Sequence, residues 1–206
     1  MSPFIPLAPK IIDPRNPLGM KLDFNDWNQI KDNINSGLFR PIANSSVASS
    51  VASVSFTSLP QTFTNLFFLA YARSDNAVAQ NVGIRLNNDA TAIYDENYFF
   101  NSNATTVSSG IINSGALWSQ VCVAVASGGP TGSFGISWGF ISYYSSTLYL
   151  KNGLYWRSYY NSVTAPVSSV QSFGVQYRST SAISRIDFIA GAGNIVAGSR
   201  FGIYGF

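Results

Sequence analysis

The sequence predicts an all-β protein, a jelly-roll-like β-sandwich preceded by an extended N-terminal arm and one short α-helix. From Val54 onward, short apolar or alternating segments are separated by clusters of Gly, Asn and Ser, as expected for many strands. No second segment with helical periodicity appears after Gly37. The composition, 46% hydrophobic, 15% aromatic and only 10% charged, favours one large β domain with a short appendage over two domains.

The segment from Met1 to Leu18 predicts an extended arm. Its five prolines remove backbone donors and prevent regular pairing in a sheet. The apolar residues between them favour an arm that buries surface over the alternative, a disordered leader. The segment lacks the uninterrupted apolar run of a secretory signal. No stretch of the sequence reaches the roughly 18 apolar residues of a membrane span, so we expect no membrane insertion.

Apolar residues recur at spacings of three and four after Asp23, a favourable N-cap, and predict a helix that Gly37 ends. A helix of about twelve residues needs a docking partner. That partner is either its own sandwich or the same helix of symmetry mates, and we favour the second. Attachment or oligomerisation is assigned to apolar residues of the arm and helix: Phe4, Ile5, Leu7, Phe24, Trp27, Ile30 and Ile34.

The Ser-, Ala- and Val-rich segment from Ala43 to Ala52 predicts a linker. The expected organisation is an arm and helix over residues 1–42, a linker over 43–53 and a β-sandwich over 54–206. Strands are expected within the sandwich at Val54 to Leu59, Phe63 to Arg73, Val82 to Leu86, Leu117 to Ala126, Ser133 to Tyr143, Thr147 to Lys151 and Ser172 to Tyr177.

The segment from Ile183 to Phe206 predicts a strand, a glycine turn and a second strand, which together form a C-terminal hairpin. In the first strand, Ile186 and Phe188 alternate with charged residues, so one face is buried. The second strand, Arg200 to Phe206, is too apolar to remain unpaired. We therefore expect it to close the sandwich.

Several segments resemble a group of tailed-bacteriophage structural proteins. The resemblance covers about Val54 to Tyr98 and Ile183 to Phe206, and its motifs are Ser55 to Leu66 (SFTSLPQTFTNL), Ala72-Arg73-Ser74, Arg85 to Asp89 (RLNND) with Tyr94, Gly193-Asn194, Ala197 to Phe201 (AGSRF) and Ile203 to Phe206 (IYGF). It implies a β-sandwich of a kind that commonly trimerises. It also implies a role in the virion as a tail fibre, minor structural or decoration protein.

The sequence offers few groups for catalysis or metal binding. It contains no histidine, the commonest general base. Asp95 and Glu96 would face opposite sides of a strand and are explained more simply as a solvated turn. Calcium ligands drawn from Asp89 and this pair would match no recognisable loop. Cys122 lies in an apolar run and should pack as a small hydrophobe. We therefore expect no enzymatic activity, cofactor or metal, and the scattered charges of a net +3 do not indicate nucleic-acid binding.

Aromatic residues are concentrated between Tyr143 and Tyr160, where neighbouring rings of an extended chain cannot all face one core. Some must lie at a surface, and the candidates are Tyr144, Tyr155, Trp156, Arg157, Tyr159 and Tyr160. Packing between subunits is one explanation, and contact with a host-surface glycan or protein is the other. For the second, we expect this segment to make the contact and not the C-terminal hairpin.

These observations together predict a non-enzymatic phage virion protein, assembled in the host cytoplasm and exposed on the particle exterior. We expect a homotrimeric short tail fibre or other host-recognition appendage whose N-terminal arm attaches it to other virion proteins. A capsid decoration protein is the alternative. A glycan depolymerase is a third possibility, for which the sequence offers no catalytic pair.

Overall fold

The computed structural model describes residues 39–102, 107–160 and 168–206. The chain divides into two compact units, Met1–Arg40 and Pro41–Phe206, and the second is all-β, as predicted. The predicted arm and helix, with their seven candidate attachment residues, lie outside the described residues. Within the described ranges, no helix has the length and apolar character needed to cross a membrane.

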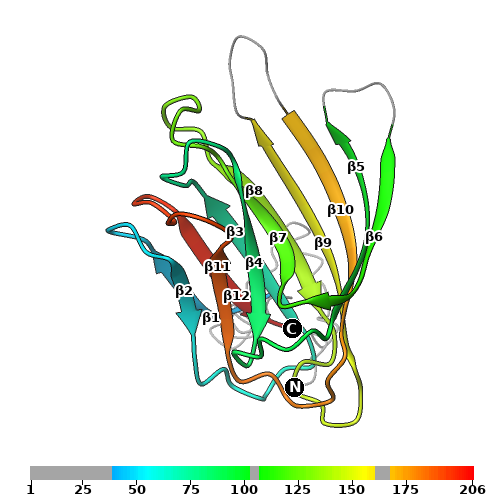
Figure 1. Ribbon diagram of the computed structural model, residues 1–206. Helices are drawn as coiled ribbons and strands as arrows, with labels where there is room; N and C mark the ends of the chain where they lie inside the picture. Colours follow the sequence, from blue (N-terminus) through cyan, green and yellow to red (C-terminus); the bar gives the residue numbers. More distant parts are fainter. Residues whose placement is uncertain (1–38, 103–106, 161–167) are drawn as a thin grey trace, which may run out of the picture. The chain divides into compact units, whose positions relative to one another are not determined.

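Two antiparallel sheets form a sandwich (Figure 1). The larger sheet has eight strands in the order β1 (Arg40–Ser46), β12 (Arg200–Gly205), β3 (Leu66–Ala72), β8 (Gly135–Ile141), β9 (Lys151–Tyr160), β10 (Ser168–Tyr177), β5 (Tyr94–Ser102) and β6 (Ser108–Ala116). The smaller sheet has four strands in the order β2 (Ser53–Phe56), β11 (Ile186–Ala190), β4 (Gln80–Leu86) and β7 (Ser119–Ala124).

The strand order is that of a jelly roll with four added strands. The order β1-β12-β3-β8 in one sheet and β2-β11-β4-β7 in the other places the first strands beside the last, as two nested Greek keys do. In chain order, β5 and β6 are inserted between β4 and β7, and β9 and β10 are inserted between β8 and β11. Because β10 pairs with β5 from Ser169 to Tyr177, the two insertions join into one extension of the larger sheet.

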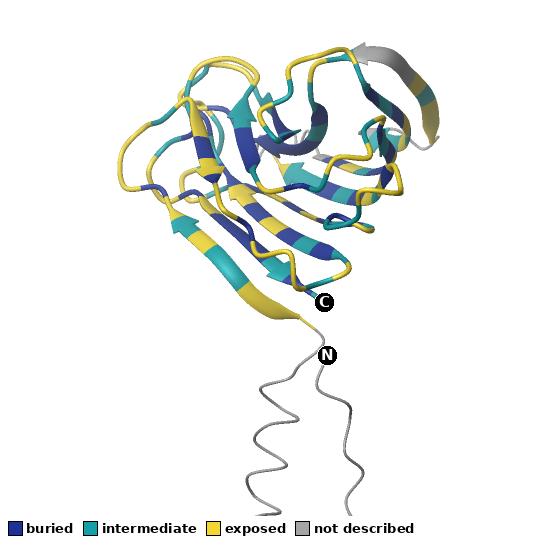
Figure 2. Ribbon diagram, turned by 90° about the horizontal axis from the view of Figure 1, so that it is seen from below, coloured by how far each residue is buried: buried dark blue, intermediate teal, exposed yellow. Residues whose placement is uncertain are grey.

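The core lies between the sheets and is rich in aromatic residues. Phe188 of the smaller sheet packs against Phe201 and Phe68 of the larger, with ring centroids 4.8 and 5.9 Å apart. Phe68 also meets Tyr155 at 5.1 Å. Buried and more exposed residues alternate along β3 and β8 of the larger sheet and along β2 of the smaller, and Figure 2 shows such alternation as changing colours along strands. Alternation of this kind gives each sheet one face toward the core and one face outward.

The two C-terminal strands do not form the predicted hairpin. β11 lies in the smaller sheet between β2 and β4, whereas β12 lies in the larger sheet between β1 and β3. The connection between them crosses from one sheet to the other. Backbone hydrogen bonds between Ile195 and Val51 (2.8 and 3.0 Å) fix this connection. β12 is nevertheless paired on both sides, with β1 and with β3, as expected for so apolar a strand.

The predicted linker over residues 43–53 belongs to the sandwich instead. β1 covers its first residues and pairs with β12, and the Val47 side chain is buried. The N–H of Val47 donates to the Ser199 carbonyl at 2.9 Å. The sequence does not predict β5 or β6, which the structure contains. Most of the predicted strand from Thr147 to Lys151 is a loop. The remaining predicted strands each overlap an observed one.

Candidate binding surface on the eight-stranded sheet

The outward side of the larger sheet is the first candidate, because its strands place large apolar side chains there in register. Alternate residues of β3, β8 and β9 point away from the smaller sheet. Leu69 pairs with Trp138, and Trp138 pairs with Trp156, so the three side chains form one row across three strands. Phe67 and Phe140 pair in the neighbouring row.

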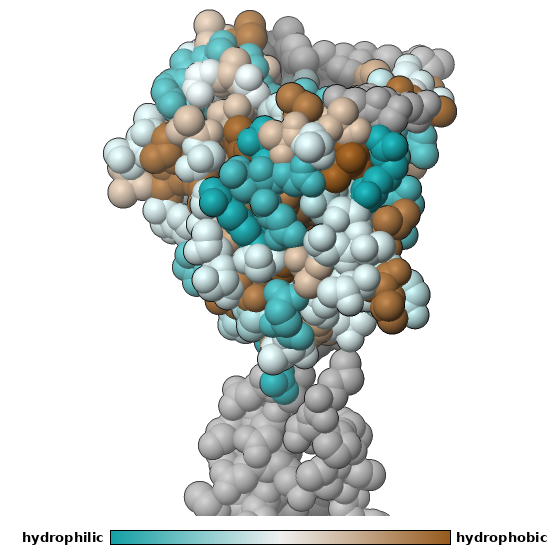
Figure 3. All heavy atoms as spheres, turned by 60° about the horizontal axis from the view of Figure 1, so that its bottom comes forward, coloured by the Kyte–Doolittle hydropathy of each residue, from teal (hydrophilic) through white to brown (hydrophobic). Residues whose placement is uncertain are grey.

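We call this surface the outer aromatic face. Its members are exposed or half-buried apolar residues of six strands, namely Phe67, Leu69, Tyr71, Phe99, Ile136, Trp138, Phe140, Leu154, Trp156, Val170 and Tyr204. The exposed fraction reaches 51% at Phe99 and 57% at Val170. On the side of the molecule that Figure 3 turns forward, hydrophobic residues form separate patches among polar ones. Single exposed apolar residues are ordinary in soluble proteins, but a contiguous set marks an interaction surface.

Ring contacts within the outer aromatic face fix the side chains before any partner arrives. Trp138 and Trp156 stack with centroids 6.0 Å apart and planes inclined by 15°. Phe67 meets Phe140 at 5.3 Å and Tyr204 at 5.9 Å, which continues the contacts across β12, β3 and β8. Rings held by one another lose little conformational entropy on binding, and this favours association.

Charges lie at the borders of this face. None of its eleven members carries a charged side chain. Arg200 is paired in register with Tyr71 at one border. At another, Arg178 Nε and Asp95 Oδ2 form an ion pair at 3.2 Å. The face is therefore nearly neutral, and its partner must be apolar or uncharged rather than strongly ionic.

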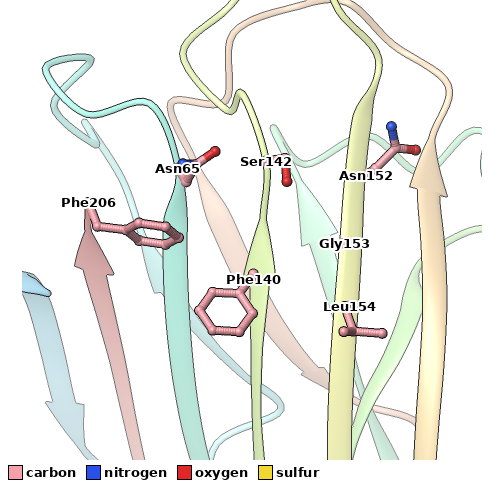
Figure 4. Close-up of a pocket in the computed structure, with 7 residues that line it drawn as sticks. All are labelled: Asn65, Phe140, Ser142, Asn152, Gly153, Leu154 and Phe206. Atoms are coloured by element: carbon pink, nitrogen blue, oxygen red, sulfur yellow. The ribbon is translucent and has the colours of Figure 1, made fainter. Parts of the chain in front are cut away.

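A shallow open pocket of about 520 Å³ lies at one end of the outer aromatic face, where β3 and β9 begin and β8 and β12 end (Figure 4). Its lining residues are Asn65, Phe140, Ser142, Asn152, Gly153, Leu154 and Phe206. Figure 4 shows Phe206, Phe140 and Leu154 across the sheet, with polar side chains toward the strand ends. Phe206 belongs to the C-terminal segment that we expected to contribute nothing to binding.

The six candidates from the aromatic segment are divided between the inside and the outside of the sandwich. Tyr144, Tyr155 and Arg157 are buried, so our expectation that they contact a receptor or a neighbouring subunit is corrected. The Tyr144 hydroxyl donates to the Pro60 carbonyl. Burial raises the pKa of the Tyr155 hydroxyl, so it stays protonated.

The other three candidates reach the outside. Trp156 belongs to the outer aromatic face, Tyr159 is half-buried, and Tyr160 is 55% exposed at the end of β9. Alternation explains the division, because neighbouring residues of one strand face opposite sides. The sequence predicted correctly that the rings could not share one core, but their assignment to a side required the register of β9 with β8 and β10.

A buried polar cluster lies between β7 and the added strands, and sequence reasoning missed it. Arg157 Nε donates to Gln171 Oε1 at 2.7 Å, and the guanidinium lies over the Phe173 ring, 4.4 Å from its centroid. Burial lowers the pKa of Arg157 to about 10, which leaves it charged at neutral pH. Glu96, expected in a solvated turn, is 1% exposed and accepts the N–H of Gln120. The cluster faces the interior of the sandwich, and Gln120 and Gln171 are half-buried.

The remaining candidate chemical groups have structural roles. Cys122 is fully buried, and burial raises the pKa of its thiol to about 11, in agreement with the predicted core packing. Asp89 accepts hydrogen bonds from Thr91 and from the Tyr177 hydroxyl, as a capped turn does. Asp95 and Glu96 lie on opposite faces of β5. Among the described residues, no group of three or more His, Cys, Asp or Glu side chains is placed to hold a metal ion.

Comparisons with known proteins identify no relative. No family model, no curated protein and no solved structure matches the chain.

Proposed function

We propose that this chain is a non-enzymatic structural protein of a tailed-phage particle, a homotrimeric short tail fibre or host-recognition appendage anchored by its N-terminal arm. The outer aromatic face is the observation that supports this best. A jelly roll is a fold that capsid and lectin domains use, and it agrees with this role. The sequence resemblance from Val54 to Tyr98 and from Ile183 to Phe206 supplies the virion context.

A second copy of the chain is the partner that the outer aromatic face fits. Its eleven side chains are half-buried or 37–57% exposed, and seven of them are aromatic. Together they offer on the order of 800 Å², the area per partner of a standard interface. The face has no charge to repel its own copy. It spans β12 to β5, and strands about 4.8 Å apart make it wide enough to present two halves. In a trimer, part of this face packs against the next copy and leaves the end at Phe140 and Leu154 uncovered.

The trimer is tested by a charge placed on the face. Ile136→Glu buries an unpaired carboxylate in any contact made there, so the full-length protein should change from trimer to monomer in light scattering at micromolar concentration. Val78→Glu is the matched control, because Val78 is 62% exposed in the loop before β4 and is not part of the face. A monomeric parent protein, or the same mass in solution for Ile136→Glu and Val78→Glu, would contradict the proposed trimer.

The location on the particle is tested by imaging. Labelling of the chain in intact particles, followed by electron microscopy, should place it on the tail. A label on the head would instead support capsid decoration, the second candidate, which the same resemblance includes. Complete absence of the label from particles would overturn both.

The non-enzymatic part of the proposal rests on the side chains present. The sequence has no histidine. A depolymerase that hydrolyses glycosidic bonds generally uses two carboxyl groups across one bond, about 5–10 Å apart and facing the same cleft. Asp95 and Glu96 face opposite sides of β5, and Glu96 is enclosed in the core. Incubation with a host polysaccharide should therefore release no reducing ends, whereas their steady release would contradict this part.

A further inference from the structure

We propose that the shallow pocket at the end of the outer aromatic face binds one or two neutral sugar rings of a saccharide chain. This inference deepens the proposed recognition role and rests on it for the source of the saccharide, a cell-surface polysaccharide. The binding chemistry is carried by the pocket itself. Five features of the pocket support it.

The floor of the pocket is apolar and partly aromatic. Phe140 and Phe206 meet edge to face, with centroids 5.7 Å apart and planes inclined by 77°. Leu154 extends the floor onto β9 (Figure 4). A sugar ring has an apolar C–H side that packs on such a surface while its hydroxyls remain available to polar groups.

The rim supplies hydrogen-bond donors and acceptors in fixed orientations. Asn65 Oδ1 accepts the N–H of Tyr143 at 3.2 Å, so the amide nitrogen of Asn65 is the atom left for a ligand. Asn152 Oδ1 accepts from Gln176 Nε2 at 3.1 Å, which orients its amide in the same way. The Ser142 hydroxyl lies between them along the pocket rim. Amide and hydroxyl groups of this kind recognise hydroxyl-rich ligands.

The pocket is electrically neutral. None of its seven lining residues is acidic or basic. The nearby Lys151 is buried, and its ammonium donates to the carbonyls of Ser146, Tyr149 and Thr180 at 2.6, 2.7 and 3.0 Å. Its charge is therefore already satisfied by the protein backbone. An anionic ligand would lose hydration without gaining a cation, so a neutral saccharide fits better than a uronic acid or a phosphate.

The size and shape suit part of a longer molecule. A volume of about 520 Å³ lies within the usual range of ligand sites, roughly 300–1,000 Å³. Because the pocket is shallow and open, a bound ring can continue into solvent at both ends. The pocket therefore suits one or two rings of a longer chain, whose other rings remain in solvent.

The pocket is held in place by paired backbone segments. Asn65 and Phe206 exchange backbone hydrogen bonds at 3.0 and 3.1 Å, and the N–H of Ser142 donates to the Asn152 carbonyl at 2.8 Å. The lining residues therefore lie at ends of paired strands, and little ordering is required on binding.

The test uses the full-length protein and saturation-transfer NMR with neutral di- and trisaccharides of glucose, galactose, mannose, rhamnose and N-acetylglucosamine at millimolar concentration. At least one should receive magnetisation, and its uronic-acid counterpart should receive less. Asn152→Ala should weaken binding about fivefold, the effect of one lost hydrogen bond. Phe206→Leu, which keeps the apolar contact but removes the ring, should weaken it as well.

Asn97→Ala is the matched control, because Asn97 is an exposed asparagine on β5 of the same sheet, separated by β10 from Leu154 and not part of the pocket lining. It should leave both binding and the melting temperature unchanged. Transfer to none of the saccharides, or equal losses for Asn97→Ala and Asn152→Ala, would overturn the inference. Sugar binding by a chain absent from phage particles would instead overturn the proposed function and leave the pocket assignment standing.

Discussion

At the scale of single residues, the buried carboxyl group of Glu96 makes stability depend on pH. Burial raises its pKa from 4.5 to about 7, although the N–H of Gln120 and the charge of Arg157 act in the opposite direction. Between these pH values the folded state binds more protons than the unfolded state, so stability falls as pH rises. A shift of this size corresponds to a fall on the order of 3 kcal/mol.

Glu96→Gln should remove this dependence. The amide has the same shape and cannot ionise, so the free energy of unfolding of the variant should lack the fall between about pH 4.5 and 7. Urea unfolding at a series of pH values measures it. Asp95→Asn is the matched control, since Asp95 lies at the surface of the same strand beside Arg178, and it should keep the parent's slope. Parallel curves for the parent and Glu96→Gln would contradict the prediction.

Neighbouring Tyr155 and Trp156 should respond differently to truncation. Tyr155→Ala opens a cavity in the core and should destabilise the protein by about 3–5 kcal/mol at every protein concentration. Trp156→Ala should cost less than half as much in dilute solution. Its cost should grow with concentration, because the proposed trimer would cover the outer aromatic face. Equal costs at high dilution would show that Trp156 is already buried within one copy.

This pair also shows what sequence reasoning could and could not provide. The aromatic surplus between Tyr143 and Tyr160 correctly predicted rings outside the core. Which of two adjacent rings faces outward depends on a shift of one residue in register, and nothing within the segment determines that shift. The pocket is even harder to predict from the sequence, because its lining residues come from four chain segments between Asn65 and Phe206.

At the scale of elements, Arg73 holds the loop between β7 and β8. Its Nη1 donates to the carbonyls of Pro130 and Ser133 at 2.6 and 3.0 Å, and its Nη2 to those of Ser127 and Gly129 at 2.8 and 2.9 Å. The planar fork of arginine makes these bonds together, whereas a lysine ammonium has three donors and no fork. The loop is therefore ordered by one side chain that directly follows β3.

Arg73→Lys should lower the free energy of unfolding by about 1–3 kcal/mol, because at least one partly buried carbonyl loses its donor. It should also increase amide exchange in the loop. Chemical denaturation and hydrogen exchange measure the two effects. Arg200→Lys, the same exchange at an exposed position, should change stability by less than about 0.5 kcal/mol. Similar results for both variants would mean that the four bonds contribute little.

The strands that the sequence did not predict share a physical cause. β5 begins with Tyr94-Asp95-Glu96-Asn97, where charged and amide residues suggest a turn, and β6 is rich in Ser, Gly and Asn. Both become strands because β10 and β5 provide backbone partners far along the chain. Tertiary pairing overrides weak local preference in such segments. The prediction of a C-terminal hairpin was wrong for a related reason. Two strands joined by a glycine-containing connection can pair with each other or can join opposite sheets.

At the scale of the whole molecule, the boundary between attachment and sandwich is expected to lie before β1. A chain of residues 39–206 should keep the parent's melting temperature and fail to enter particles, because it retains every strand and lacks the arm. A chain of residues 54–206 loses β1 and the hydrogen bonds of Val47 and Val51, and should be less stable by at least about 2 kcal/mol. Thermal unfolding and particle assembly assays measure both. Equal stability of the two chains would show that residues 43–53 are a linker and contribute nothing to the stability of the sandwich.

The position of β1 beside β12, and of β2 beside β11, has a consequence for synthesis on the ribosome. Among the described residues, each of these two early strands has a single neighbour in its sheet, and that neighbour follows most of the domain in the chain. At about 5–20 residues per second, Arg40–Ser46 waits on the order of 10 s for Arg200–Gly205 to emerge. The nascent domain therefore keeps open edges until β11 and β12 appear, and a chain stalled or truncated before them would present those edges to its neighbours on the same messenger.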